Sequence, residues 1–407
     1  MKGRRVFCLL LMVTMLVGIM AGCGAQNTTT LPGSATPAAS ATPATTTTPT
    51  AAPKSLLDMD WNEIEAAAKK EGKVVFWVWH DESFWVQLGQ AFEKKYGIEF
   101  ELVVSEKNAG VDKALVEKDG AKGSFDVMKV GGESTKTTMD ANLYTGPILP
   151  KIEFKDKLDQ GLSARQEGVE IKGYLVPVHR NQTGLLYNPR KVTNPPQTWA
   201  ELEAWIDANP KKFGFCIPEK GGSGQAFVHS AIKEVAGGLD KYYGDTEVVD
   251  SKTANWDLVW KWLNDRKSKI TLTTSNNDSL ARLNQGELDL VVAWDDNAFR
   301  TISAGELFKD ATLYIPEFGM SGGGDTVGLM KNAPNPAAGL LLINFMTSEE
   351  GQQLFIEVMN TYPARTDLSA KATLIKPEDM KNRLNWIPAP YKKKFIEDFT
   401  KNVMMVK

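Results

Sequence analysis

One stretch, residues 174–202, most constrains how this chain can fold. It reads YLVPVHRNQTGLLYNPRKVTNPPQTWAEL and holds two short apolar runs, Tyr174–Val178 and Gly184–Tyr187, that predict strands on either side of a mostly polar middle. Three prolines then exclude helix until Thr198, which forms a capping box with Glu201 and starts one. A strand that leads into a second strand, a turn and a helix indicates a crossing from one domain into the next.

Length and composition agree with two ordinary globular domains. The 407 residues exceed what one hydrophobic core normally serves. Apolar residues make up 42% and charged residues 24%, and the formal net charge is −3. This charge balance does not indicate nucleic acid as a partner.

The N-terminus predicts export and a membrane anchor. Three positive charges precede the apolar run Val6–Ala21, which is too short to span a bilayer comfortably, so residues 1–22 are expected to be a signal peptide. The run ends in Met20–Cys23, which resembles the lipobox of bacterial lipoproteins and implies lipidation of Cys23. The protein would then sit on the extracytoplasmic face of the cell membrane. The alternative is a plain secretory signal with an incidental cysteine.

Residues 23–54 are expected to form a disordered tether behind that cysteine. Between Asn27 and Lys54 the chain has ten Thr, seven Ala and five Pro. Such a segment cannot bury enough apolar surface to fold.

Residues 55–180 predict an α/β domain with parallel strands. Lys73–Trp79 reads as a buried strand, and a helix around Phe84 separates it from the strand Ile98–Val104. The strand Phe125–Val130 follows a further helix. Strand, helix and strand at this spacing form a βαβ unit.

A second α/β domain is expected over residues 181–318, and residues 319–407 would return to the first. Thr326–Met330 reads as the returning strand, and Pro336 begins an apolar helix. Thr347 and Glu350 predict a capping box for the next helix. A last helix is expected near residues 392–404, with its placement left open.

Both crossings resemble those of bacterial extracellular solute-binding proteins. The first carries a "YN" turn at Tyr187 and an NPPxTWxEL helix start at Asn194–Leu202; the return reads KNAPNPAAGLLLINFMTSEEGQQLF, followed by an xPxR turn at Tyr362–Arg365. The resemblance implies a type II periplasmic-binding-protein-like fold, in which two α/β lobes joined by crossover strands close on a solute. It also implies a monomer that delivers the solute to the permease subunits of an ABC importer.

The stretches EGKVVFWVW and VPVHRNQTGLLYNP look more like the subgroup that binds polyamines, thiamine or iron than like the sugar binders. Neither stretch selects one of these ligands.

Candidate ligand residues follow strand ends, because ligands of open parallel sheets bind beyond the carboxyl ends of strands. Trp79 and Trp294 each end a strand beside carboxylates, a pairing that favours a cationic or amine-bearing solute, although sugars also stack on tryptophan. Either tryptophan could instead be core. The full set of predicted ligand residues is Trp79, His80, Asp81, Glu133, Arg180, Gln182, Ser223, Gln225, Trp294 and Asp295.

Several of these residues have a second interpretation. Asp295 or its neighbour Asp296 could cap a helix instead of touching solute. Gly221–Gly224 could cradle an anion at a helix start or form a plain turn. Arg180 and Gln182 could contact solute or only bond the crossing strands together.

Enzymatic patterns are lacking, so the sequence predicts a binding protein without cofactor or metal. The three histidines are widely separated, and no HExxH or CxxC motif occurs. Cys216, in an apolar strand, is expected to be a small core residue. A lipoprotein that senses a ligand for a membrane receptor and a cell-surface hydrolase remain as alternatives.

Overall fold

The computed structural model describes residues 54–132, 134–370 and 374–406. The predicted signal peptide, Cys23 and the tether up to residue 53 lie outside this part of the chain, as does Glu133. Among the described residues, no helix has the length and apolarity needed to cross a membrane.

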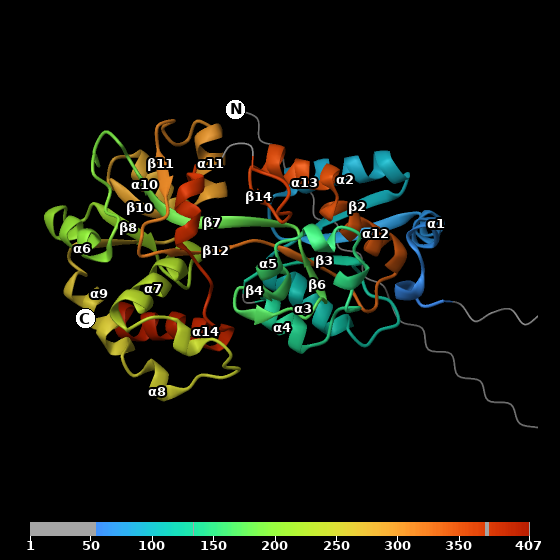
Figure 1. Cartoon of the computed structure of the whole chain (residues 1–407), viewed down its shortest axis with the longest axis horizontal. Coiled ribbons are helices and arrows are strands. Elements are labelled where there is room, and N and C mark those ends of the chain that lie inside the picture. The colour runs from blue at the N-terminus through green and yellow to red at the C-terminus, as the bar shows by residue number, and fades with distance from the viewer. Residues whose placement is uncertain (1–53, 133, 371–373, 407) are drawn as a thin grey trace, which may run out of the picture. The chain divides into compact units, whose positions relative to one another are not determined.

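The first sheet and the helices packed on it form lobe 1 (Figure 1). Its strands lie in the order β2-β1-β3-β13-β6, where β1 pairs in parallel with β2 and β3, and β13 pairs antiparallel with β3 and β6. The strands are β1 Lys73–Val78, β2 Glu99–Val104, β3 Val127–Val130, β6 Leu175–Pro177 and β13 Thr326–Leu329, with a small hairpin of β4 Arg165–Gln166 and β5 Val169–Glu170. The helices are α1 Trp61–Glu71, α2 Glu82–Tyr96, α3 Lys107–Glu117, α4 Ser134–Asp140, α5 Gln160–Ala164, α12 Pro336–Thr347 and α13 Glu349–Leu354.

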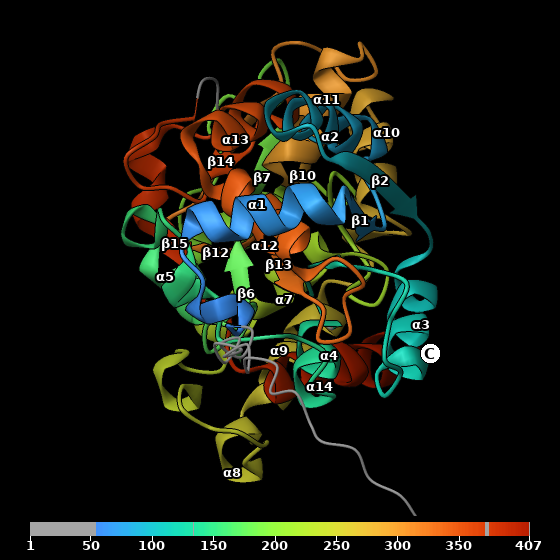
Figure 2. The same ribbon diagram turned by 90° about the vertical axis from the view of Figure 1, so that its right-hand side faces the viewer.

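The buried strand β1 explains how this sheet holds helices on both faces. Val74, Phe76 and Val78 belong to one hydrophobic cluster, whereas Val75 and Trp77 belong to another. Successive side chains of a strand point to opposite faces, so a continuous apolar run fills both cores at once. Helices α1 and α12 lie beside each other on one face (Figure 2).

Lobe 2 is built around the longest strand, β7. Its sheet has the order β15-β12-β7-β10-β8-β9, and β11 and β14 also pair with β7. The strands are β7 His179–Tyr187, β8 Phe213–Cys216, β9 Ile270–Thr273, β10 Leu290–Trp294, β11 Thr312–Tyr314, β12 Met320–Gly323, β14 Tyr362–Pro363 and β15 Arg383–Leu384. The helices are α6 Trp199–Ala208, α7 Gly222–Val235, α8 Asp250–Thr253, α9 Trp256–Asp265, α10 Asn276–Asn284, α11 Asp295–Ser303 and α14 Ala389–Phe399.

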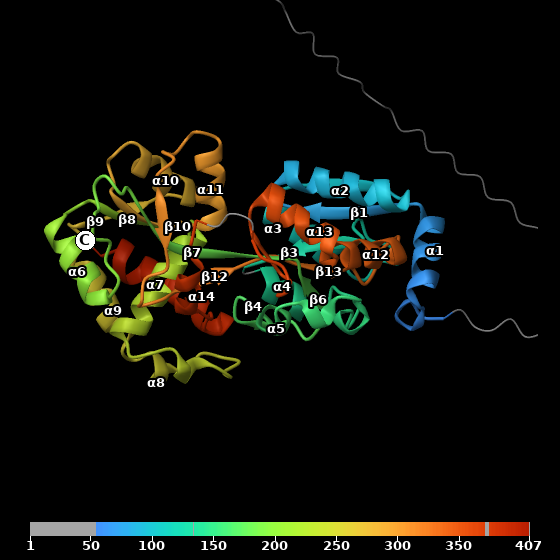
Figure 3. The same cartoon turned by 45° about the horizontal axis from the view of Figure 1, so that its top comes forward.

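Among the described elements the chain passes between the lobes three times: a first departure and return lie side by side, and a later passage leads from α13 of lobe 1 to β15 and α14 of lobe 2. The chain first leaves through the step from β6 to β7 at Val178 and returns through the step from β12 to β13, where the Val178 amide donates to the carbonyl of Asp325 at 3.1 Å. β7 and β12 run side by side between the two groups of elements (Figure 3). We call these paired strands the hinge ribbon.

The sequence predicted two strands separated by a polar middle, and this is wrong in one respect. The polar residues 179–183 are not a break, because they form the first half of β7. Their backbone is paired: Gln182 and Asn181 face Gly322 and Gly323 of β12, while Arg180 pairs with Tyr362 of β14. The buried polar side chains of Gln182 and Thr183 are tolerated in this strand because they donate to the carbonyls of Met320 and Ser321.

The C-terminal helix packs on lobe 2. Trp386, Tyr391, Phe395 and Phe399 belong to the same hydrophobic cluster as α7 and α9, and α14 lies beside α7 in Figure 1. The sequence had left this placement open. Cys216, at the end of β8, is fully buried, as expected of a core residue.

Candidate functional site

A cavity of about 490 Å³ lies where strand ends and helix starts of both lobes meet. Lobe 1 contributes the residues that follow β1 and β3, and lobe 2 contributes the ends of β10 and the starts of α7, α10 and α11. The hinge ribbon contributes His179 and Asn181. We call this cavity of about 490 Å³ the front cavity. This is the position expected of a ligand site, beyond the carboxyl ends of sheet strands.

Trp79 lines the front cavity, but protein cations already lie over its ring. Lys129 Nζ is 4.3 Å from the ring centroid and Lys107 Nζ is 5.0 Å from it. Both distances are within the range of a cation–π contact. Trp79 therefore does not need a ligand cation to satisfy its aromatic face.

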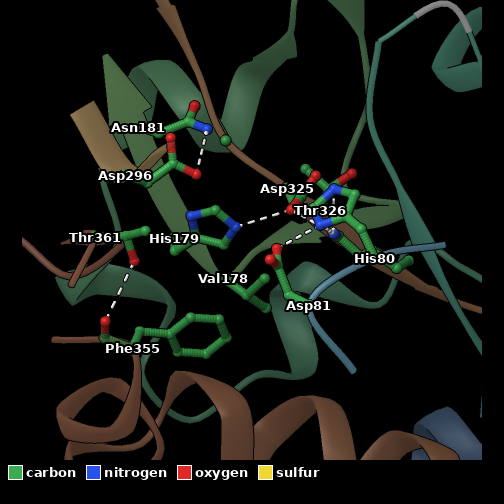
Figure 4. A network of polar contacts seen from close by, with 12 residues as sticks. His80, Asp81, Val178, His179, Asn181, Asp296, Asp325, Thr326, Phe355 and Thr361 are labelled. Carbon is green, nitrogen blue, oxygen red and sulfur yellow. Dashed lines mark hydrogen bonds and ion pairs between the residues drawn. The ribbon is translucent and has the colours of Figure 1, made fainter. Parts of the chain in front are cut away.

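A polar network around Asp325 and His179 forms part of the wall of the front cavity (Figure 4). Asp325 Oδ2 lies 2.9 Å from Lys129 Nζ and 2.9 Å from His179 Nε2, and Lys129 Nζ lies 2.9 Å from His80 Nε2. Burial opposes ionisation of Asp325, but the charge of Lys129 and the hydrogen bond from His179 outweigh it and hold its pKa well below the ordinary value. The fully buried Lys129 thus has its counter-ion inside the protein.

Asp81 joins the two lobes at the rim of the front cavity. Its carboxylate contacts the ring of His80 and forms an ion pair with Arg300 of α11. Burial raises the pKa of Asp81, but the hydrogen bond from His80 and the nearby positive charges lower it to about 2. Asp81 is therefore ionised across the physiological range, and its pairing with Arg300 connects the loop after β1 to lobe 2.

The lobe 2 wall presents an aromatic ring beside unpaired acceptors. Trp294 lies directly against Gly222, where a side-chain Cβ would come within 2.9 Å of its ring, so only glycine admits this approach. Asn181 Nδ2 lies 3.5 Å from Asp296 Oδ2, and Figure 4 shows the two groups facing each other. Asp296 Oδ1 and Asn181 Oδ1 are buried and have no hydrogen-bond partner among the described residues.

The structure separates the predicted ligand residues into three groups. Those that line the front cavity are Trp79, His80, Asp81, Gln225 and Trp294. Arg180 and Gln182 point away from it, into a second cavity on the other face of the hinge ribbon. This follows from the strand alternation that sends Asn181, between them, to the front.

Ser223 and Asp295 line neither cavity. Ser223 Oγ donates to Asn276 Oδ1 at 2.8 Å and so fixes the start of α10. Asp295 Oδ1 accepts from the amides of Gln182 at 2.9 Å and Asp296 at 2.8 Å, which ties the hinge ribbon to α11. Burial raises the pKa of Asp295 well above its ordinary value, and the neighbouring Asp296 raises it further.

Sequence reasoning missed Lys129, Asp325 and Arg300 as members of this site. Lys129 carried a readable signal, because it and Asp126 are the two charges inside the otherwise apolar run Phe125–Val130. A charged residue in a buried strand is costly unless a partner compensates it. Asp325 and Arg300 had no such local signal, since their partners are far away along the chain. No group of His, Cys, Asp and Glu among the described residues is arranged to hold a metal ion.

The sequence matches the model of a family described as "Bacterial extracellular solute-binding protein" over residues 87–382. No curated protein matches it.

Solved structures of solute-binding proteins share the fold. An extracellular solute-binding protein of Bordetella parapertussis is 16% identical, with a TM-score of 0.66 over 82% of this chain and 99% of that one. The spermidine/putrescine-binding PotD of Streptococcus pneumoniae is 14% identical, with a TM-score of 0.62 over 82% and 97%. A solute-binding protein of Thermotoga lettingae with bound α-D-tagatose is 17% identical, with a TM-score of 0.62 over 81% and 93%. At these identities the likeness shows a common type II periplasmic-binding-protein fold.

Proposed function

Because this chain belongs to the family of bacterial extracellular solute-binding proteins, we propose that it captures a small solute in the front cavity and delivers it to the permease of an ABC importer. The two lobes would act as rigid bodies that close on the solute by rotation at the hinge ribbon. Two lobes that share few connecting residues form a two-state element that a ligand can bias.

The choice of solute rests on two hydrogen-bond acceptors beside Trp294 that have no partner among the described residues. Buried polar atoms are normally hydrogen-bonded, so Asp296 Oδ1 and Asn181 Oδ1 mark where a ligand donor would bind. His179 Nδ1, also buried without a partner, lies on the same cavity wall. Its Nε2 already faces Asp325, so a neutral His179 offers Nδ1 as a third acceptor.

These acceptors favour a solute with an amine over a neutral sugar. Asp296 is 7% exposed, and no cation of the described residues forms an ion pair with it. A buried carboxylate is costly unless an opposite charge compensates it, and an ammonium group supplies that charge whereas a hydroxyl does not. Trp294, rather than Trp79, would provide the aromatic face, because lysines already lie over Trp79.

A ligand screen by thermal unfolding tests this proposal. Purified protein is heated with spermidine, putrescine, thiamine, neutral monosaccharides or ferric ion, each in excess. A ligand present at a hundred times its Kd stabilises the native state by about 2.7 kcal/mol, which is easily measured. We expect amines to raise the unfolding midpoint. A rise with neutral sugars alone would overturn the preference for an amine.

Asp296→Asn is the matched variant for that screen. It keeps the size of the side chain and removes the charge, so we expect amine affinity to fall at least about tenfold, the loss of one charge-assisted contact. The midpoint without ligand should change little. An amine that binds the variant as tightly as the wild type would place its binding site elsewhere.

We propose further that Cys23 is lipidated and that residues 23–54 tether the folded part to the membrane. The support is the lipobox-like Met20–Cys23 followed by a segment rich in Thr, Ala and Pro, the composition typical of a linker. Cys23→Ser should leave the protein released or unprocessed. Normal processing and membrane retention of this variant would refute the anchor.

The family supports transport over sensing or catalysis, and uptake measurements test this preference. Cells that lack this protein should lose uptake of the ligand found in the screen, and the wild-type gene should restore it. Normal uptake together with a lost transcriptional response to the ligand would favour the sensing lipoprotein. Turnover of the ligand by purified protein, abolished by a cavity carboxylate variant, would favour the hydrolase.

A further inference from the structure

A second cavity, of about 950 Å³, lies on the opposite face of the hinge ribbon from the front cavity. Arg180 and Gln182 of β7 line it, while Asn181 between them lines the front cavity. The small β4–β5 hairpin of lobe 1 forms one wall, and the segment around β15 forms the other. Glu167 and Trp386 border both cavities and separate them. We call this the rear cavity.

Cations outnumber anions in the wall of the rear cavity. Its charged lining residues are Arg165, Lys172, Arg180, Lys381 and Arg383 against Asp159, Glu167 and Glu170. Each of the three carboxylates already has a partner: Arg180 at 3.1 Å for Asp159, Arg165 at 3.0 Å for Glu170, and Lys392 for Glu167. Across the described residues, no carboxylate pairs with Lys172, Lys381 or Arg383.

Both unpaired polar groups of the rear cavity, among the described residues, are able to donate a hydrogen bond. Arg180 Nε is buried without a partner, and so is the hydroxyl of Ser163, a residue only 7% exposed. This is the reverse of the front cavity, where the carboxylate and amide oxygens of Asp296 and Asn181 lack donors. Two donors without acceptors, in a wall with surplus positive charge, fit a ligand that brings acceptors and negative charge.

The guanidinium of Arg180 is held in place for such a ligand. Its Nη1 donates to Asp159, and its carbon lies 5.5 Å from the ring centroid of Tyr362. Burial lowers the pKa of Arg180, and repulsion from Arg383 lowers it further, so the two guanidinium groups affect each other across the cavity. Within the described part of the chain, the Arg383 side chain donates one hydrogen bond, from Nε to the carbonyl of Met380 at 3.2 Å. An anion between the two arginines would relieve their repulsion.

We propose that the rear cavity binds a small oxyanion, a carboxylate or phosphate, between Arg180, Arg383 and the Ser163 hydroxyl. These three residues come from the hinge ribbon, from β15 on the lobe 2 sheet and from α5 of lobe 1. The bound anion thus joins both lobes at the side opposite the solute.

Isothermal titration of the purified protein with inorganic phosphate and with citrate, at constant ionic strength, tests the site. We expect saturable binding of one anion per chain. Arg383→Gln and Ser163→Ala should each weaken it, the arginine variant by about tenfold or more, as expected for loss of a charged hydrogen-bond partner. Arg383 is exposed, so its replacement should leave the unfolding midpoint unchanged.

Arg190→Gln is the matched control, because Arg190 is an exposed arginine of lobe 2 that pairs with Asp310 and lines neither cavity. Equal weakening by Arg190→Gln and Arg383→Gln, or heats that never saturate, would overturn the site. Asp296→Asn separates this proposal from the proposed function: it should weaken amine binding and leave phosphate and citrate affinity unchanged. Loss of anion affinity in Asp296→Asn would place the anion in the front cavity and also overturn the rear site.

Discussion

Two adjacent aspartates, Asp295 and Asp296, differ in what their side chains contact. Asp295 and Asp296 both lie in the first turn of α11, and both are buried. Asp295 uses Oδ1 to hold two backbone amides, one of them in the hinge ribbon. Asp296 keeps one oxygen without a partner in the front cavity. The sequence prediction chose Asp295, because nothing in a DD pair shows which member faces a cavity.

In Asp295→Asn, the free energy of unfolding should fall less with rising pH than it does in the wild type. The pKa of Asp295 is raised in the folded state, first by burial and then by Asp296, so the native state holds a proton that the unfolded chain releases near its ordinary pKa of 3.8. Wild-type stability must therefore fall as pH rises from about 4 through the raised pKa. The asparagine cannot lose this proton, and its Oδ1 can still accept both amides.

Urea unfolding from pH 4 to pH 8 measures this difference. The stability of Asp295→Asn relative to the wild type should increase with pH over that window. If the two free energies of unfolding differ by the same amount at every pH from 4 to 8, Asp295 does not titrate in that range.

Trp294→Ala tests whether this tryptophan serves the ligand or the core. Trp294 is half-buried at the front cavity, whereas Trp260 of the same lobe is 3% exposed and packs in its core. We expect Trp294→Ala to reduce ligand affinity about tenfold through loss of the aromatic face and to leave the ligand-free midpoint nearly unchanged. Trp260→Ala, the control, should lose about 3–5 kcal/mol of stability. A similar collapse in Trp294→Ala would make Trp294 a core residue.

At the scale of the element, local rules located most helices and strands but not every boundary. The predicted capping box of α6 is present: Glu201 N donates to Thr198 Oγ1 at 3.2 Å, and Glu201 Oε2 accepts from the Thr198 amide. The box predicted at Thr347 is wrong by one residue. Ser348 caps α13, since its Oγ accepts from Gly351 N at 3.1 Å, while Thr347 ends α12 and donates to the Asn344 carbonyl. Two neighbouring hydroxyl residues offer the same local signal, and packing decides between them.

Thr198→Ala should destabilise lobe 2 by about 1 kcal/mol, because the first turn of α6 loses the acceptor for an otherwise unpaired amide. The denaturant midpoint of the purified protein measures the loss. Thr198→Ser keeps the hydroxyl and should retain most of the stability. Equal losses in both variants would attribute the effect to the threonine methyl group rather than to the cap.

For the hinge ribbon and α14, the local sequence pattern does not predict strand pairing or helix placement. The polar start of β7 did not read as strand, because its pairing with β12 and β14 depends on segments more than a hundred residues away. The placement of α14 likewise follows from contacts of Tyr391, Phe395 and Phe399 with α7 and α9. Periodicity predicts that such a helix has an apolar face, but not which core covers it.

At the scale of the whole molecule, the candidate site illustrates the same limit. His80, Lys129, His179 and Asp325 are scattered along the sequence and meet only because four chain segments converge at the lobe junction. The rule that ligands bind beyond strand ends did locate Trp79, Asp81 and Trp294 in one cavity. It could not separate the two faces of the hinge ribbon, so Arg180 and Gln182 were assigned to the front.

The front and rear cavities lie on opposite faces of one hinge, so a ligand bound in one should weaken binding in the other. A rotation that brings the lobes together at the front separates their walls at the rear, and an anion that draws Ser163 toward Arg383 resists that rotation. Linkage makes the effect reciprocal: phosphate or citrate should weaken solute binding, and solute should weaken anion binding by the same factor. The expected factor is about fivefold or more, the lower range of known couplings.

Spin labels on the two lobes can follow this coupling directly. Cysteines would replace the exposed Gln87 of α2 and Ser303 of α11 in protein that also carries Cys8→Ser and Cys23→Ser. Cys216 should stay unlabelled, because burial raises the pKa of its thiol to about 12. We expect the distance between labels to shorten with solute and lengthen with citrate, and Arg383→Gln to abolish only the citrate effect. If citrate binds but neither the distance nor the solute Kd changes, the rear cavity holds an anion without opposing closure, and the coupling is refuted.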